Sequence, residues 1–159
     1  MSNSVSAANV SEMKVSAQES AASLRFSNTV VAYTILRVSF GANIMLHGVS
    51  RLLAGHAAFL AYLNHYFEKT PVMPASMLPA FASVLPWVET TLGLLLLLGI
   101  ATRFSLIVGA LVVTALVIGT NLAQDWLVSG LQLIYAFLYY YLLVHLNENL
   151  LSVDGFLKG

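Results

Sequence analysis

The sequence contains no cysteine, which excludes disulfides, thiolate-ligated zinc, cysteine-ligated iron–sulfur clusters and a thiol nucleophile. Charged residues are also scarce: they make up 9% of the 159 residues, against about 25% in typical soluble chains. The net charge is zero and the basic residues are scattered singly, so nothing indicates a nucleic-acid partner. Because 58% of the residues are hydrophobic, the composition predicts an integral membrane protein.

Sequence motifs for the common cofactors are absent as well. There is no GxGxxG fingerprint for a flavin or nicotinamide, no P-loop and no nucleophile elbow. His47 and His145 fall at opposite membrane faces of the predicted topology, so they cannot clamp one haem. His56 and His65 lack a supporting carboxylate pattern, which disfavours a metal site. We therefore expect no haem, flavin, iron–sulfur or metal centre.

Long apolar segments are what the sequence has in abundance. At 1.5 Å per residue, each of four segments can cross a hydrocarbon core about 30 Å thick. Only residues 101–103 separate the second segment from the third, so these two form an antiparallel hairpin. The sequence therefore predicts an all-α membrane bundle of four transmembrane helices, at about residues 29–53, 79–100, 104–122 and 127–146.

Two segments are too polar to span a membrane. Residues 1–27 are rich in Ser, Ala, Asn and Glu, and we expect a polar N-terminal tail, with a short surface helix at 16–24, before a membrane domain at 28–159. The tail lacks the order of a secretory signal. Between the first two spans, residues 55–77 carry one apolar helix face, which predicts a short interfacial helix along the membrane surface: Phe59, Leu60, Leu63 and Phe67.

The basic residues near the span ends predict the orientation of the bundle. Arg51 and Lys69 fall on one side of the membrane, against four residues on the other: Lys14, Arg25, Arg103 and Lys158. Cytoplasmic loops carry the excess of Lys and Arg, so we expect both termini in the cytoplasm.

Ionisable residues within spans are costly, by about 2.5 to 3.5 kcal/mol on insertion scales, and usually face the bundle interior. Asn43, His47 and Arg51 follow one another at four-residue spacing, which places them on one helix face. Glu89 stands three residues after Pro86, whose ring frees a backbone carbonyl. We interpret Glu89 as a site candidate. A stabilising ion pair without chemistry is an equal alternative, with the cation supplied by Arg37, Arg51 or protonated His47.

Further polar and small residues mark the later spans. Gln124 and Asp125 follow the third span, and Gln132, Tyr135 and Tyr139 form a stripe on the fourth. The tyrosines are equally compatible with an interfacial belt or core packing. Small residues are expected to allow close helix packing without chemistry: Gly93, Gly99, Ser105 and Gly109.

Three segments resemble the DoxX family, which includes the DoxD-type membrane subunit of thiosulfate:quinone oxidoreductase. They are LRVSFGANIMLHGVSRL, LPWVETTLGLLLLLGIATR, and GTNLAQDW followed by GLQLIYAFLYYYLL. The likeness covers roughly residues 33–154. It implies four membrane helices and, in some members, electron delivery into the quinone pool. We expect a bacterial or archaeal cytoplasmic membrane protein in contact with lipid.

The resemblance implies a membrane subunit of a quinone-linked oxidoreductase or respiratory complex, with the thiosulfate:quinone type as one candidate. A quinone head group would bind between helices near the outer face, and other subunits would carry the electron-donating cofactor. The candidate catalytic residues are His47, Glu89 and Asp125. The candidate head-group ligands are Asn43, Arg51, Gln124, Gln132 and Tyr135.

Two other functions are compatible with the same residues. In a non-catalytic structural or assembly subunit of a redox complex, the buried polar groups would only fix helix register and partner docking. A small transporter is less favoured, because the two halves of the chain show no internal similarity. Whether the chain is itself an enzyme stays open at this point.

Overall fold

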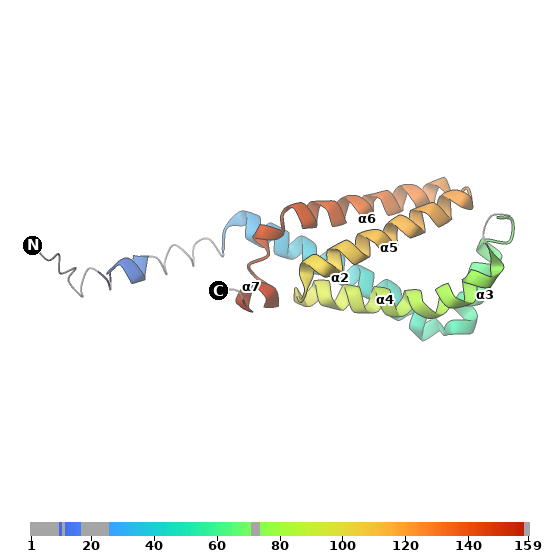
Figure 1. Ribbon diagram of the computed structural model, residues 1–159, viewed down its shortest axis with the longest axis horizontal. Helices are drawn as coiled ribbons and strands as arrows, with labels where there is room; N and C mark the ends of the chain where they lie inside the picture. Colours follow the sequence, from blue (N-terminus) through green and yellow to red (C-terminus); the bar gives the residue numbers. More distant parts are fainter. Residues whose placement is uncertain (1–9, 11, 17–25, 71–73, 158–159) are drawn as a thin grey trace, which may run out of the picture.

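The computed structural model describes residues 10, 12–16, 26–70 and 74–157, and this part of the chain contains helices but no strand. Four long helices run side by side as an elongated bundle (Figure 1): α2 (Asn28–Ala54), α4 (Leu78–Leu98), α5 (Thr102–Leu122) and α6 (Trp126–Val144). All four are long and apolar enough to cross a membrane, which confirms the predicted all-α membrane bundle. The tail helix predicted at 16–24 lies outside the described residues, apart from Ser16.

Shorter elements occupy the two ends of the bundle (Figure 1). The helix α3 (His56–Tyr66) stands at one end, between the first two long helices, where a short helix was predicted. Its apolar face packs against the start of α4, with Phe59 and Leu63 buried. The first turn of α2 lies at the other end, together with α7 (Val153–Leu157). The described residues also form two short 3-10 helices, η1 (Ala75–Met77) and η2 (Leu146–Glu148). The position of α3 along the membrane surface stays a prediction, and so does the placement of both termini in the cytoplasm.

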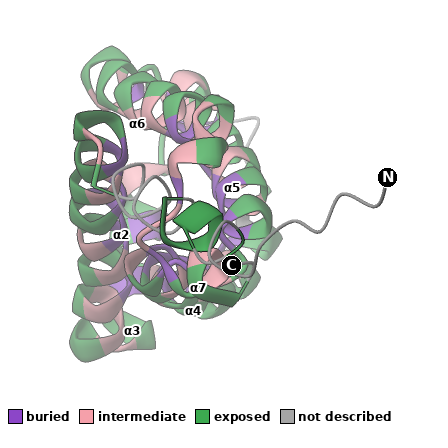
Figure 2. Ribbon diagram, turned by 90° about the vertical axis from the view of Figure 1, so that its left-hand side faces the viewer, coloured by how far each residue is buried: buried purple, intermediate pink, exposed green. Residues whose placement is uncertain are grey.

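The buried and exposed residues are divided as a membrane bundle requires. Figure 2 shows the buried residues on the inward sides of the four long helices and the exposed ones on the outside. Many of these exposed side chains are large and apolar, among them Trp87, Leu111, Leu127 and Phe137. An apolar outer surface is stable in contact with lipid chains, so the chain is an integral membrane protein.

The helices α2 and α4 pack against each other at backbone distance. A Cβ atom added at Gly93 would lie 2.2 Å from the backbone nitrogen of Met45, and one at Gly48 would lie 2.5 Å from the carbonyl oxygen of Pro86. Gly41 faces the carbonyl of Gly93 in the same way. Glycine removes the side chains that would hold two membrane helices apart, so the packing role predicted for Gly93 is confirmed.

Arg37 is buried and binds backbone rather than a carboxylate. Its guanidinium donates to the carbonyl of Leu96, to that of Leu97 at 3.1 Å and to that of Leu151 at 3.0 Å. The first two belong to the last turn of α4, whose carbonyls have no partner within the helix. Of the three cations considered for Glu89, Arg37 is thus not the one that pairs with it.

The next helix begins with a complementary contact from the end of the chain. The Asp154 carboxylate accepts hydrogen bonds from the backbone N–H groups of Ala101 at 2.9 Å and Thr102 at 2.7 Å, at the N-terminus of α5. A carboxylate is favoured there because the helix dipole is positive at that end. Between the two helices, Gly99 adopts φ +69°, and a Cβ atom there would meet the Arg37 guanidinium. Gly99 therefore ends α4 rather than serving only helix packing.

Replacing Gly93 by Ala should destabilise the protein, because the added methyl group meets backbone atoms that cannot move aside. Overpacking of this kind costs about 1–3 kcal/mol. The control is Gly130→Ala on α6, where an added Cβ meets nothing within 4 Å. It should change stability by less than about 1 kcal/mol. Thermal unfolding of both variants in detergent measures the difference, and equal melting temperatures would contradict the close α2–α4 packing.

Candidate functional site

The centre of the candidate site is an ion pair between α2 and α4. The Arg51 guanidinium donates a hydrogen bond to the Glu89 carboxylate, and the two side chains are 28% and 9% exposed. Their meeting follows from the helix packing, since Gly48, one turn before Arg51, lies against Pro86 and Thr90 on either side of Glu89. Of the three cations considered from the sequence, Arg51 is therefore the one that compensates the buried carboxylate.

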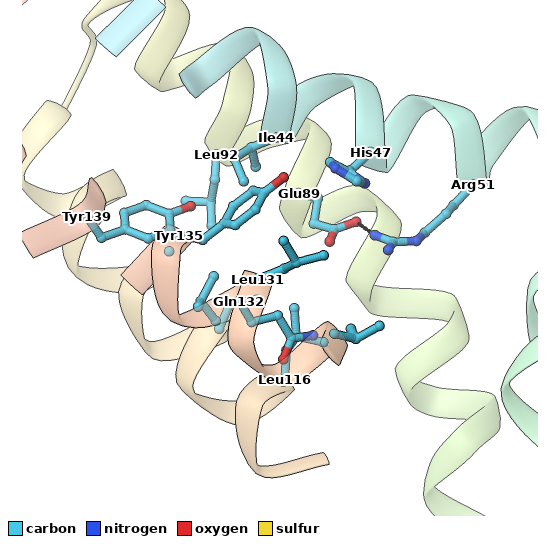
Figure 3. Close-up of a pocket in the computed structure, with 14 residues that line it drawn as sticks. Ile44, His47, Arg51, Glu89, Leu92, Leu116, Leu131, Gln132, Tyr135 and Tyr139 are labelled. Carbon is cyan, nitrogen blue, oxygen red and sulfur yellow. Dashed lines mark hydrogen bonds and ion pairs between the residues drawn. The ribbon is translucent and has the colours of Figure 1, made fainter. Parts of the chain in front are cut away.

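This ion pair borders a cavity of about 280 Å³ lined by residues of all four long helices. Figure 3 shows the side chains of His47, Arg51 and Glu89 on one side of it, with Gln132 and Tyr135 of α6 opposite. The remaining lining is mostly apolar, including Ile44, Leu92, Val112, Val113, Leu116, Val128 and Leu131. The cavity thus combines a few convergent polar groups with apolar walls, the usual composition of a small-molecule site.

Two residues of α2 meet the tyrosine at the α6 side of this cavity. Asn43 donates a hydrogen bond from its amide nitrogen to the Tyr135 hydroxyl at 2.9 Å. The His47 ring lies edge-on to the Tyr135 ring, with centroids 6.3 Å apart. His47 is exposed and lines the cavity, whereas Asn43 is outside its lining. Asn43 therefore orients Tyr135 and does not itself face the cavity.

The other two polar side chains of α6 are held by α5 and α2. Gln132 accepts a hydrogen bond from the Thr120 hydroxyl at 2.8 Å, so the amide nitrogen is the group of this side chain suited to donate to a ligand. Tyr139 is buried with its ring against Gly109, where a Cβ atom would lie 2.4 Å from it, and edge-on to Phe40. The small residue at Gly109 is needed to admit this ring, which confirms its predicted packing role.

Gln124 and Asp125 lie apart from this cavity, in the turn between α5 and α6. Asp125 caps α6 by accepting from the backbone N–H of Val128 at 3.1 Å, and it accepts from the Tyr66 hydroxyl at 2.8 Å. Gln124 is exposed and has φ +58°. Asp125 and Gln124 were predicted as a catalytic residue and a ligand, and those roles stay predictions without a cavity contact to support them.

The Tyr66–Asp125 hydrogen bond joins α3 to the turn between α5 and α6. Burial, followed by this hydrogen bond to a carboxylate, raises the pKa of the Tyr66 hydroxyl above its ordinary value. Tyr66 therefore remains a proton donor at neutral pH, and the contact persists. Tyr66 was not among the site residues predicted from the sequence, although Tyr62 and Tyr66 stand four apart on one face of the helix, which was a detectable signal.

A second cavity of about 690 Å³ adjoins the first beneath α3. Its lining is mainly apolar and aromatic, from α3, α4 and α5. Arg51, Leu116, Val128 and Gln132 line both cavities, so the two share a boundary. Among the described residues, no group of three or more His, Asp or Glu side chains could hold a metal ion.

Removing one member of the ion pair should cost more than removing both charges. Arg51→Met leaves the Glu89 carboxylate without its cation, and Glu89→Gln leaves the guanidinium facing a neutral amide. We expect each single change to cost on the order of 2 kcal/mol, below the roughly 3–5 kcal/mol of a fully buried pair because Arg51 is partly exposed. The double variant should recover part of the loss. Unfolding of all four proteins in detergent gives the coupling, and additive losses would argue against the pair.

Comparison with known proteins identifies the family of the chain. The family model described as DoxX matches residues 32–125, more than half of the chain. No curated protein and no solved structure matches significantly. The match includes His47, Arg51 and Glu89 and ends at Asp125, before Gln132 and Tyr135. The chain is therefore a member of the DoxX family of membrane proteins.

Proposed function

We propose that this protein is the membrane subunit of a quinone-linked oxidoreductase or respiratory complex, with a quinone head group bound in the cavity beside Arg51 and Glu89. The observation that carries the proposal is the ion pair at the wall of a cavity that also receives His47, Gln132 and Tyr135. Ionisable groups within a membrane bundle are costly, and where they occur they commonly mark functional sites.

The residues of the cavity fit a quinone head group. Such a group is a flat, largely apolar ring whose two carbonyl oxygens accept hydrogen bonds. Arg51, His47 and the Gln132 amide can donate to these oxygens, and the apolar walls can contact the ring. The volume of about 280 Å³ is close to the lower limit of ligand pockets, about 300 Å³, and the adjoining cavity extends it.

The chain's own groups supply hydrogen bonds and protons. Reduction of a quinone to a quinol takes two electrons and two protons, and the electrons would come from a partner subunit with a redox cofactor. The Glu89 carboxylate, which pairs with Arg51, lies on the same side of the cavity as His47, and a histidine with a carboxylate can relay a proton. His47 is exposed at the cavity, so it can collect a proton and release it toward a bound carbonyl oxygen. Asn43 keeps the Tyr135 hydroxyl in place beside it.

A non-catalytic assembly subunit is the second candidate. It is favoured by the way in which the other polar groups serve the bundle itself: Arg37 binds the end of α4, and Asp125 caps α6. If Arg51 and Glu89 likewise only fix the register of α2 and α4, the protein would bind no quinone. Changing them would then lower the yield of the complex but not its turnover.

The deciding experiment is gentle extraction of the complex from its native membrane, followed by identification of the copurifying proteins and of bound quinone. We expect Glu89→Gln to abolish quinone-dependent turnover with the complex still assembled, and both Glu89→Gln and His47→Ala to lose the bound quinone. The matched control is Glu68→Gln, because the Glu68 side chain is 67% exposed and lies outside both cavities. Wild-type turnover in Glu89→Gln would refute the catalytic function, and cofactor-bearing partners without quinone on this chain would favour the assembly subunit.

A further inference from the structure

The second cavity is the largest feature of the site that head-group binding does not use. It is roughly 690 Å³ in volume and lies between α3, the first half of α4 and the second half of α5. Its walls include six apolar side chains: Phe59, Leu63, Phe67, Leu78, Phe81 and Leu85. With few polar groups in its lining, it suits a flexible apolar chain better than a polar ligand.

From the first cavity to the second, the lining changes from one with convergent polar side chains to one that is mainly apolar. Arg51 stands at this boundary: its guanidinium pairs with Glu89 on one side, and its central carbon lies 5.2 Å from the centre of the Phe59 ring on the other. Gln132 also lines both cavities. A ligand with a flat polar head and a long apolar tail would match this sequence of environments.

The cavity is covered by α3 and open beside it. The start of α3 is joined directly to α2 through Gly55, and the end of α3 is tied to Asp125 by the Tyr66 hydrogen bond. Both ends of the helix are therefore held over the cavity. Tyr62, Met77 and Val84 also line the cavity and are each more than half exposed. The lining of the cavity therefore reaches the exposed surface beside α3.

We infer that the cavity beneath α3 holds the apolar polyprenyl tail of the quinone whose head group lies beside Arg51 and Glu89. The inference rests on the proposed function for the identity of the head group. A tail gains little free energy by moving from lipid into an equally apolar cavity, so its main effect is to orient the head group. Quinones with and without a tail should accordingly bind with similar affinity, and the tail should mainly fix the position and orientation of the bound head group.

The test uses the full chain in lipid nanodiscs and two probes. One is a benzoquinone with a ten-carbon tail that carries a photoreactive diazirine, and the other is the same benzoquinone without a tail. Ala80→Phe and Ala115→Phe each place a ring in the wall of the second cavity, and neither residue lines the first. The matched control is Ala61→Phe, an exposed position on α3 outside both linings.

We expect photolabelling on α3, α4 and α5, reduced at least fivefold by Ala80→Phe and by Ala115→Phe and unchanged by Ala61→Phe. Binding of the tailless benzoquinone should survive both cavity-filling changes. Labelling spread over the lipid-facing side of α6, with the same yield in the filled variants, would overturn the inference. So would a diazirine phospholipid that labels the cavity and is not displaced by the tailed quinone.

The same preparation separates this inference from the proposed function. If the tailless benzoquinone binds the wild-type protein but not Glu89→Gln, and the tail labels only the outer surface, the tail cavity is refuted and the head-group site stands. If the tailless benzoquinone does not bind the wild type at all, the proposed function fails and the tail cavity with it.

Discussion

The close packing of α2 on α4 is the constraint on which the rest of the structure depends. Gly41, Gly48 and Gly93 let the two backbones approach to a distance that no larger residue permits. In a bilayer the surrounding lipid is as apolar as the helices, so association depends on packing and on interhelical polar contacts rather than on the hydrophobic effect. At this crossing both are provided together, since the glycines that allow contact also bring Arg51 to Glu89.

Two arginines on α2 illustrate how position along a helix decides a charge's partner. Arg37 and Arg51 are fourteen residues apart, about 21 Å along the axis at 1.5 Å per residue. Because α4 runs antiparallel to α2, Arg37 meets carbonyls of the last turn of α4, and Arg51 meets a carboxylate near the middle of that helix. The first contact closes the end of the bundle, together with Asp154 at the start of α5. The second places charge beside a cavity.

The cavity arises from uneven packing among the four helices. The helix α2 packs mainly on α4, and α5 packs mainly on α6, with fewer contacts between the two pairs. Polar side chains from both pairs face the space left between them, and α3 extends this space by covering an apolar cavity next to it. A cavity with convergent polar groups that continues into an apolar cavity is the common basis of the proposed quinone function and of the proposed tail site.

The four membrane helices and the family could be predicted from the amino-acid sequence alone. The apolar segments and the breaks between them placed every span within two residues of its observed ends. This is possible because a helix that crosses a bilayer must satisfy its own backbone hydrogen bonds and so depends on local sequence. The partner of Glu89 could not be predicted in this way. Arg37, His47 and Arg51 share one helix, and only the register of α2 on α4 selects Arg51. Likewise, the Tyr66–Asp125 hydrogen bond and the cavity beneath α3 depend on contacts between segments far apart in the sequence, so they follow from the folded arrangement and not from local sequence.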